Sequence, residues 1–103
     1  MKYQLVLQWT LGSFANDYDT LISTEDLLIE KMADCSAVDG HDLGSGEMNI
    51  FILTDDPRAS FLYVRSILEG SSRWTMLRAA FREAHGSEYT ILWPKYLTRF
   101  GVA

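Results

Sequence analysis

Hydrophobic and polar residues alternate at the start of the chain. From Lys2 to Thr10 one side carries only large apolar or aromatic side chains, namely Tyr3, Leu5, Leu7 and Trp9. The other side is partly polar and carries Gln4, Val6 and Gln8. This alternation with a period of two predicts a half-buried strand of an antiparallel or mixed sheet. The Gly, Ser, Asn and Asp residues within Leu11 to Asp19 predict a loop after it.

A helical period follows this loop. Leu27, Leu28 and Met32 have the spacing of a buried helical stripe, with Cys35 as a possible fourth member. The helix is expected to begin near Ser23 or Thr24, because the acidic residues directly after them would lie in the first turn. The helix dipole favours negative charge at that end. We expect the helix to end near Asp34.

Two strand-like segments flank a glycine-rich stretch. Residues 36–38 predict a short strand, with a loop as the alternative, and Asp39 to Glu47, with three glycines in nine residues, is expected to be a loop. Met48 to Thr54 is a strong strand signal that is apolar on both faces. Such a strand is typical of a central position covered on both sides, or on one side with a partner subunit on the other.

The clearest boundary in the chain is Asp55-Asp56-Pro57. An aspartate cap followed by proline at the first helical position predicts a helix from Pro57 to about Glu69. Apolar residues at helical intervals then predict a further helix from Arg73 to His85; they are Trp74, Leu77, Phe81 and Ala84. Glu88 to Trp93 is the last expected strand, which Pro94 stops.

The expected element order is therefore β-α-β-β-α-α-β. It resembles the ferredoxin-like split β-α-β plan with one helix inserted before the last strand. We expect an α+β fold with an antiparallel sheet and the helices on one face, in a single domain over residues 1–103. The alternative is a three-stranded mixed sheet, if residues 36–38 form a loop. The resemblance covers most of the chain but transfers no residue role, because such folds host many functions.

The composition excludes several classes of protein. With 48% hydrophobic and 13% aromatic residues, the chain of 103 residues is too apolar to be disordered, and one cysteine cannot form a disulfide framework. No apolar run reaches the roughly 18 residues of a membrane span, and the start lacks the features of a signal peptide. Cys35 is expected to be a small filler rather than a nucleophile. A cytoplasmic location is the prediction, since a single thiol is compatible with a reducing compartment.

Charge divides the chain into two unequal halves. Residues 1–56 carry 11 acidic and two basic side chains, whereas residues 57–103 carry three acidic and seven basic ones. The net charge of −5 disfavours nucleic acid, because phosphates would be repelled. It favours solubility and attraction to a basic protein. A simpler interpretation is that the two halves fold together and partly neutralise each other.

The glycine-rich stretch also carries groups that could do chemistry. Asp39, His41, Asp42 and Glu47 are potential metal ligands or acid–base groups. Their spacing does not fit a calcium loop of the EF-hand type, because the fifth position counted from Asp39 is Leu43. Neither the P-loop nor the hydrolase nucleophile motif is present. No catalytic residue, cofactor or metal is therefore assigned from the sequence.

Two functional hypotheses remain. The first is a small acidic, non-enzymatic interaction domain that binds a basic partner by charge complementarity, as inhibitors and immunity-type proteins do. Its expected contact residues are Asp17, Asp19, Asp39, His41, Asp42 and Glu47. The alternative is a small enzyme or a ligand- or metal-binding domain that uses the stretch from Asp39 to Glu47. A homodimer formed through the sheet or an edge strand is a third possible outcome.

Overall fold

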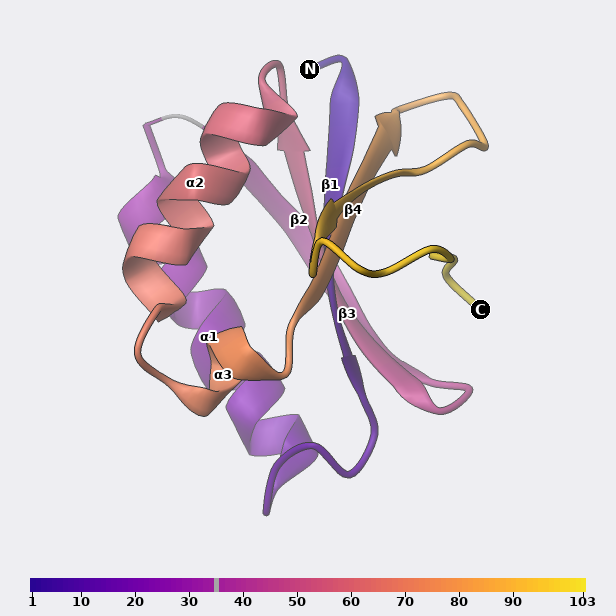
Figure 1. Cartoon of the computed structure of the whole chain (residues 1–103). Coiled ribbons are helices and arrows are strands. Elements are labelled where there is room, and N and C mark those ends of the chain that lie inside the picture. Colours follow the sequence, from indigo (N-terminus) through magenta and orange to yellow (C-terminus); the bar gives the residue numbers. More distant parts are fainter. Residues whose placement is uncertain (35) are drawn as a thin grey trace.

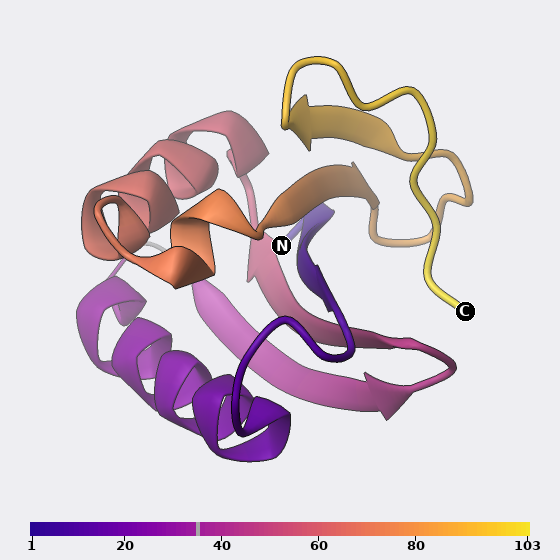
Figure 2. The same ribbon diagram turned by 60° about the horizontal axis from the view of Figure 1, so that its bottom comes forward.

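A five-stranded antiparallel sheet forms the centre of the protein, and three helices cover one of its faces (Figures 1 and 2). This computed structural model describes residues 1–34 and 36–103, and all element counts refer to them. The strands are β1 (Tyr3–Thr10), β2 (Ala37–Gly44), β3 (Glu47–Thr54), β4 (Arg78–Glu83) and β5 (Thr90–Trp93). The helices are α1 (Asp17–Met32), α2 (Pro57–Leu68) and the single turn α3 (Ser72–Thr75).

The strand order is β2-β3-β1-β4-β5. Every neighbouring pair is antiparallel, so the α+β class and the antiparallel sheet predicted from the sequence are confirmed. The order is compatible with a ferredoxin-like plan in its first four strands, with β5 as an additional edge strand. The predicted sequence of elements is not reproduced, because a strand stands where the sequence predicts most of a third helix.

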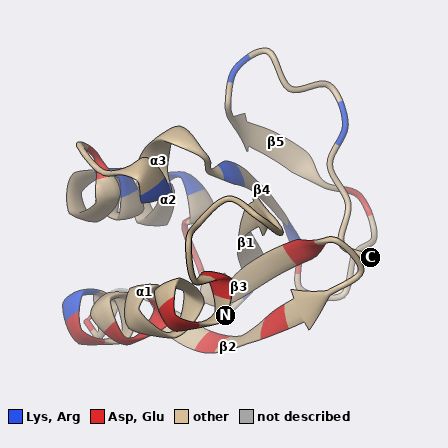
Figure 3. Ribbon diagram, turned by 90° about the horizontal axis from the view of Figure 1, so that it is seen from below, with Lys and Arg blue, Asp and Glu red and all other residues tan. Residues whose placement is uncertain are grey.

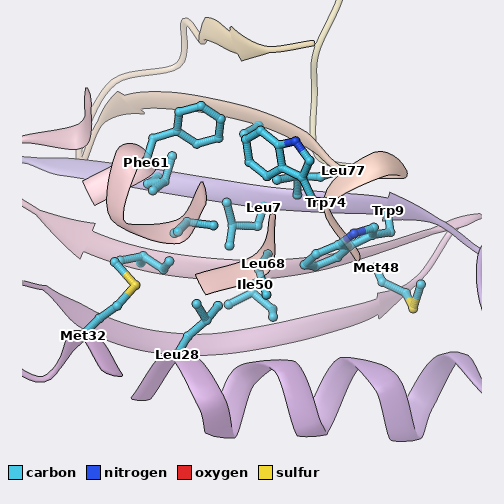
Figure 4. Close-up of a cluster of buried hydrophobic side chains, with 14 of the residues drawn as sticks. Leu7, Trp9, Leu28, Met32, Met48, Ile50, Phe61, Leu68, Trp74 and Leu77 are labelled. Carbon is cyan, nitrogen blue, oxygen red and sulfur yellow. The ribbon is translucent and has the colours of Figure 1, made fainter. Parts of the chain in front are cut away.

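One hydrophobic core draws on both halves of the chain. On β1, Leu5, Leu7 and Trp9 point into it, as the alternation predicts, and Ile50 and Ile52 of β3 lie beside them. Figure 4 shows these strands facing side chains of α1, α2 and the α3 region across the core. The helix residues that complete the cluster are Leu21, Leu28, Met32, Phe61, Val64, Leu68 and Trp74. The two halves of opposite charge are thus joined by a shared apolar interior.

The boundary at Pro57 forms as the sequence predicts. The side chain of Asp56 accepts a hydrogen bond from the Ala59 backbone N–H at 3.1 Å, and Pro57 begins α2. A buried chain of hydroxyl groups lies behind this cap: the Ser60 Oγ is 2.7 Å from the Thr54 Oγ1 and 2.7 Å from the Ser36 Oγ. These bonds satisfy polar groups inside the core and tie the start of α2 to the end of β3.

The first helix starts earlier than the sequence predicts. Asn16, which we read as a loop residue, caps α1 by accepting a hydrogen bond from the Asp19 N–H at 3.1 Å. The predicted cap Thr24 is instead buried in the middle of the helix, where its Oγ1 donates to the Thr20 carbonyl. The same residue types form turns and cap helices, so the local pattern predicts a loop at Asn16 where the structure has a helix cap.

The predicted loop from Asp39 to Glu47 is a β-hairpin. Strand β2 extends to Gly44, which pairs with Glu47, and only Ser45 and Gly46 remain in the turn. Both turn residues have positive φ, 53° and 83°, as a two-residue turn of type I′ requires. A third glycine, Gly40 with φ 123°, lies at a bulge where the register of β2 shifts. The glycines therefore shape a strand pair and do not form an open loop.

Replacing Gly46 by valine should test this hairpin. We expect the free energy of unfolding to fall by about 1–2 kcal/mol, because a β-branched residue at φ 83° is strained even though no atom lies within 4 Å of the added Cβ. Urea unfolding measures the change. Gly101→Val, at an equally open position without positive φ, is the control and should change stability by less than about 0.5 kcal/mol. Equal effects of the two substitutions would contradict the assigned turn.

The predicted helix from Arg73 to His85 is wrong. Only its first turn is helical, and Arg78–Glu83 forms β4 against β1. The residues of β4 alternate, with Ala79 next to Leu7 and Ala80 next to Val6 across the pair, and both alanines are fully buried. Alanine and arginine favour helices, but the unpaired edge of β1 offers a ladder of backbone hydrogen bonds that a local pattern does not reveal.

The second face of the sheet is also partly covered. Val6 and Gln8, on the side of β1 that the sequence suggested would be half-exposed, are buried. The Gln8 Nε2 donates to the Asn49 Oδ1 at 3.0 Å and to the Gly101 carbonyl at 2.9 Å. The C-terminal segment therefore lies against this face and shields it from water. Its Phe100 ring contacts Tyr89 with a centroid distance of 5.1 Å.

Candidate functional site

The fold separates the charges to opposite edges of the sheet. The elements α1, β2 and β3 carry eight acidic side chains and one basic one, whereas α2, α3, β4 and β5 carry five basic and one acidic. Because β2 and β5 are the two edge strands, the acidic and basic elements lie on different sides of the molecule (Figure 3). Among the acidic elements, α1 and β2 carry the exposed carboxylates of this side.

Three exposed carboxylates form a stripe along α1. Asp19, Asp26 and Glu30 are all exposed and are spaced by seven and four residues. This spacing places them on one side of an α-helix. The opposite side of the helix is apolar and buried, through Leu21 and Leu28. The stripe is thus the solvent side of an amphipathic helix, held in place by its buried side.

The edge strand β2 adds two more exposed carboxylates, Asp39 and Asp42. The bulge between Val38 and Gly40 interrupts the strand beside Asp39. Charged residues and bulges on an edge strand discourage pairing with a strand from another molecule. We call the exposed carboxylates of α1 and β2 together the acidic edge: Asp19, Asp26, Glu30, Asp39 and Asp42.

His41 joins the two elements of the acidic edge. Its Nδ1 lies 3.0 Å from both carboxylate oxygens of Glu25 on α1. The His41 side chain is 33% exposed and that of Glu25 is 12% exposed. His41 therefore pairs with a carboxylate that we did not select from the sequence, and its role here is to hold β2 against α1.

The other predicted chemical groups of the hairpin do not gather around His41. His41 and Asp42 are consecutive on a strand, so their side chains point to opposite faces of the sheet. Glu47 instead accepts hydrogen bonds from the Ala103 backbone N–H at 2.8 Å and from the Asn49 amide at 3.3 Å. Within residues 1–34 and 36–103, no group of three or more His, Cys, Asp or Glu side chains is placed to hold a metal ion. The structure thus does not bring His41, Asp42 and Glu47 together.

The predicted contact residues divide into two sets. Asp17 is half-buried and accepts hydrogen bonds from the Gly12 N–H at 2.7 Å and the Phe14 N–H at 3.1 Å, so it shapes the turn before α1. Glu47 anchors the C-terminus, as described above. Asp19, Asp39 and Asp42 are exposed and belong to the acidic edge. Cys35 lies outside the described residues.

Sequence reasoning missed two members of the acidic edge, Asp26 and Glu30. Their signal was the helical spacing from Asp19, which becomes visible only when the helix begins at Asp17. Starting the helix at Ser23 or Thr24 left Asp19 in a loop, with no regular relation to the later carboxylates. The error in the helix boundary therefore led directly to an incomplete site.

Comparison of the chain with protein-family models, with curated proteins and with solved structures finds no match. None of the described helices is both long and apolar enough to span a membrane.

Proposed function

We propose that the protein is a non-enzymatic interaction domain whose acidic edge binds the cationic surface of a protein partner. It would act in the manner of small acidic inhibitors and immunity-type proteins, which cover a basic surface by charge complementarity. The observation that carries this proposal is the gathering of exposed carboxylates from α1 and β2 at one edge of the sheet, while the arginine-bearing elements lie toward the other edge.

The dimensions of the acidic edge favour a macromolecular partner. Asp19 and Glu30 are 11 residues apart on α1, which separates them by about 16 Å along the helix axis. Carboxylates spread along such a length cannot converge on one small cation, but they can oppose several Lys or Arg side chains of a folded surface. Complementary charge of this kind mainly accelerates association and selects against acidic partners.

Neutralising the acidic edge should slow association. We expect Asp26→Asn, Glu30→Gln, Asp39→Asn and Asp42→Asn together to lower the association rate constant by about tenfold or more at low ionic strength, because the attraction that steers the encounter is lost. The partner is first captured from cells that produce the protein, then identified and purified. Surface plasmon resonance at increasing salt measures the rate constants, and the wild-type rate should fall with salt more steeply than that of the variant.

The matched control places the same chemical change elsewhere. Asp55→Asn and Glu88→Gln remove two exposed carboxylates that do not belong to α1 or β2. They should alter the association rate much less than Asp39→Asn with Asp42→Asn does. A partner that binds the neutralised variant and the wild type at equal rates, or one that presents an acidic surface, would refute the proposal.

The cytoplasmic location and the homodimer stay predictions. The strand that suggested a dimer, β3, is an inner strand paired with β1 and β2, so neither of its edges can accept a second chain. A dimer formed by strand pairing would have to use β2, which is bulged and acidic, or the four-residue strand β5, whereas a dimer through a face of the sheet stays a prediction.

A further inference from the structure

A hollow of about 490 Å³ opens at the end of the sheet away from the acidic edge, where β4 begins. Its walls come from the end of β1, the segment between α3 and β4, and the turn that follows β5. Thr10 and Arg78 are its polar side chains nearest the sheet, and Met76, Trp93, Tyr96 and Leu97 supply apolar surface. No residue of the acidic edge lines it, so it is a separate place on the molecule.

Arg78 is the only Lys or Arg among the residues that line the hollow. Its Nε is buried and has no hydrogen-bond partner among the described residues. Arg82, four residues further on the same strand, donates to Gln4 and to three backbone carbonyls, so arginines of β4 can be satisfied internally. A buried donor without an acceptor is unfavourable, and more so when it is charged. The guanidinium of Arg78, unlike that of Arg82, is therefore left for a ligand.

The walls around Arg78 are aromatic and partly exposed. Trp93 is half-buried and stacks on the core residue Trp74 with a centroid distance of 4.9 Å, so one wall is rigid. Tyr96 is 83% exposed and Met76 is 47% exposed, although both are large and apolar. Tyrosine in such a position provides contact area with little conformational freedom to lose, which is typical of binding surfaces.

We propose that this hollow binds a carboxylate carried on an aromatic or apolar body. The N–H groups of a guanidinium form a fork that matches the two oxygens of a carboxylate, and the two Nη groups of Arg78 would form it because its Nε is buried. The body of the ligand would rest between Trp93 and Tyr96. A phosphate dianion fits less well, because the lining contains no second cation to share its charge. The carboxylate can come from a free aromatic acid or from the C-terminus of a peptide that ends in an aromatic residue.

Titration with matched probes tests the site and its source. Phenylacetate is compared with neutral phenylacetamide, and a tripeptide ending in Phe is compared with its C-terminal amide. Tryptophan fluorescence and backbone NMR shifts follow the binding. We expect both carboxylates to shift the resonances of residues around Arg78 and Tyr96 in a saturable way, while each neutral partner binds about tenfold more weakly or not at all. The carboxylate probe that binds more tightly shows whether the ligand is a free aromatic acid or the C-terminus of a peptide.

Substitutions assign the binding to named side chains. Arg78→Gln should weaken carboxylate binding by about tenfold or more and leave the weak binding of the amides unchanged. Tyr96→Ala, at a position too exposed to affect folding, should weaken both carboxylates and amides. Arg99→Gln, an exposed arginine outside the hollow, is the control and should have no effect.

Three results would overturn the proposal. The first is no saturable binding of either carboxylate, and the second is equal binding of the acids and their amides. The third is tighter binding of inorganic phosphate than of phenylacetate, with the same shifted residues. If Arg78→Gln does not fold, the proposal is still tested by comparing the binding of the acids with that of their amides, in the wild type and in Tyr96→Ala.

Discussion

Replacing Trp74 by alanine is expected to lower the free energy of unfolding by about 3–5 kcal/mol. Trp74 is only 7% exposed and lies between Phe61 and Trp93, with ring centroids 5.6 and 4.9 Å away. The guanidinium of Arg65 lies 5.5 Å from its ring centroid and adds a cation–π contact. Alanine would leave a cavity between α2 and β5 and remove the support of both neighbouring rings.

Urea unfolding followed by circular dichroism measures this change. Trp74→Phe keeps an aromatic ring in the same place and should retain more than half of the lost stability. Leu62→Ala on α2 is the control, because Leu62 is 63% exposed and should contribute less than about 0.5 kcal/mol. A loss below about 1 kcal/mol for Trp74→Ala would mean that this ring is not buried between α2 and the sheet.

Replacing Arg82 by methionine is expected to lower the free energy of unfolding by about 2–3 kcal/mol. The Arg82 Nε donates to the Gln4 Oε1 at 3.0 Å, and its Nη1 donates to backbone carbonyls of the β4–β5 connection. The carbonyl acceptors are those of Gly86 at 2.6 Å, Ala84 at 3.1 Å and Glu83 at 3.4 Å. Methionine keeps the apolar length of the side chain but leaves these acceptors without their donor.

Arg82→Met should also destabilise the β4–β5 connection locally, in addition to lowering the stability of the whole protein. Hydrogen exchange should accelerate in residues 84–89 more than in β1, because the guanidinium holds that connection against the sheet. Arg99→Met changes an exposed arginine in the C-terminal segment and serves as the control. Unchanged exchange in 84–89, together with a stability loss no larger than that of the control, would show that the Arg82 contacts contribute nothing.

Elements with complete local signals were predicted well from the sequence. The first strand, the strand from Met48 to Thr54 and the helix beginning at Pro57 each agree with the structure to within about two residues. Their signals lie within the element itself: strict alternation in the first, a continuous apolar run in the second and an Asp-Pro cap in the third. No distant part of the chain is needed to interpret them.

Elements that depend on a distant partner were predicted poorly. Strand β2 is polar and glycine-rich, and it forms because β3 pairs with it through a two-residue turn. Strand β4 has a helical pattern of apolar residues, and it forms because β1 has a free edge 70 residues away in sequence. Hydrogen bonds between strands override local propensity, and a single sequence does not display them.

The sequence by itself determined the composition of the two charged halves, the α+β class and the Asp56–Pro57 cap of the second helix. It also identified Asp39 and Asp42 as acidic residues near each other, because they are near each other in the chain. Only the tertiary structure decided that Asp26 and Glu30 lie at the same edge of the sheet as these two residues, that His41 pairs with Glu25, and that Arg78 lines a hollow. The physical reason is that charge and local conformation are properties of a segment, whereas a site requires segments to be brought together. That assembly depends on strand pairing and on the burial of apolar faces that lie far apart in the chain.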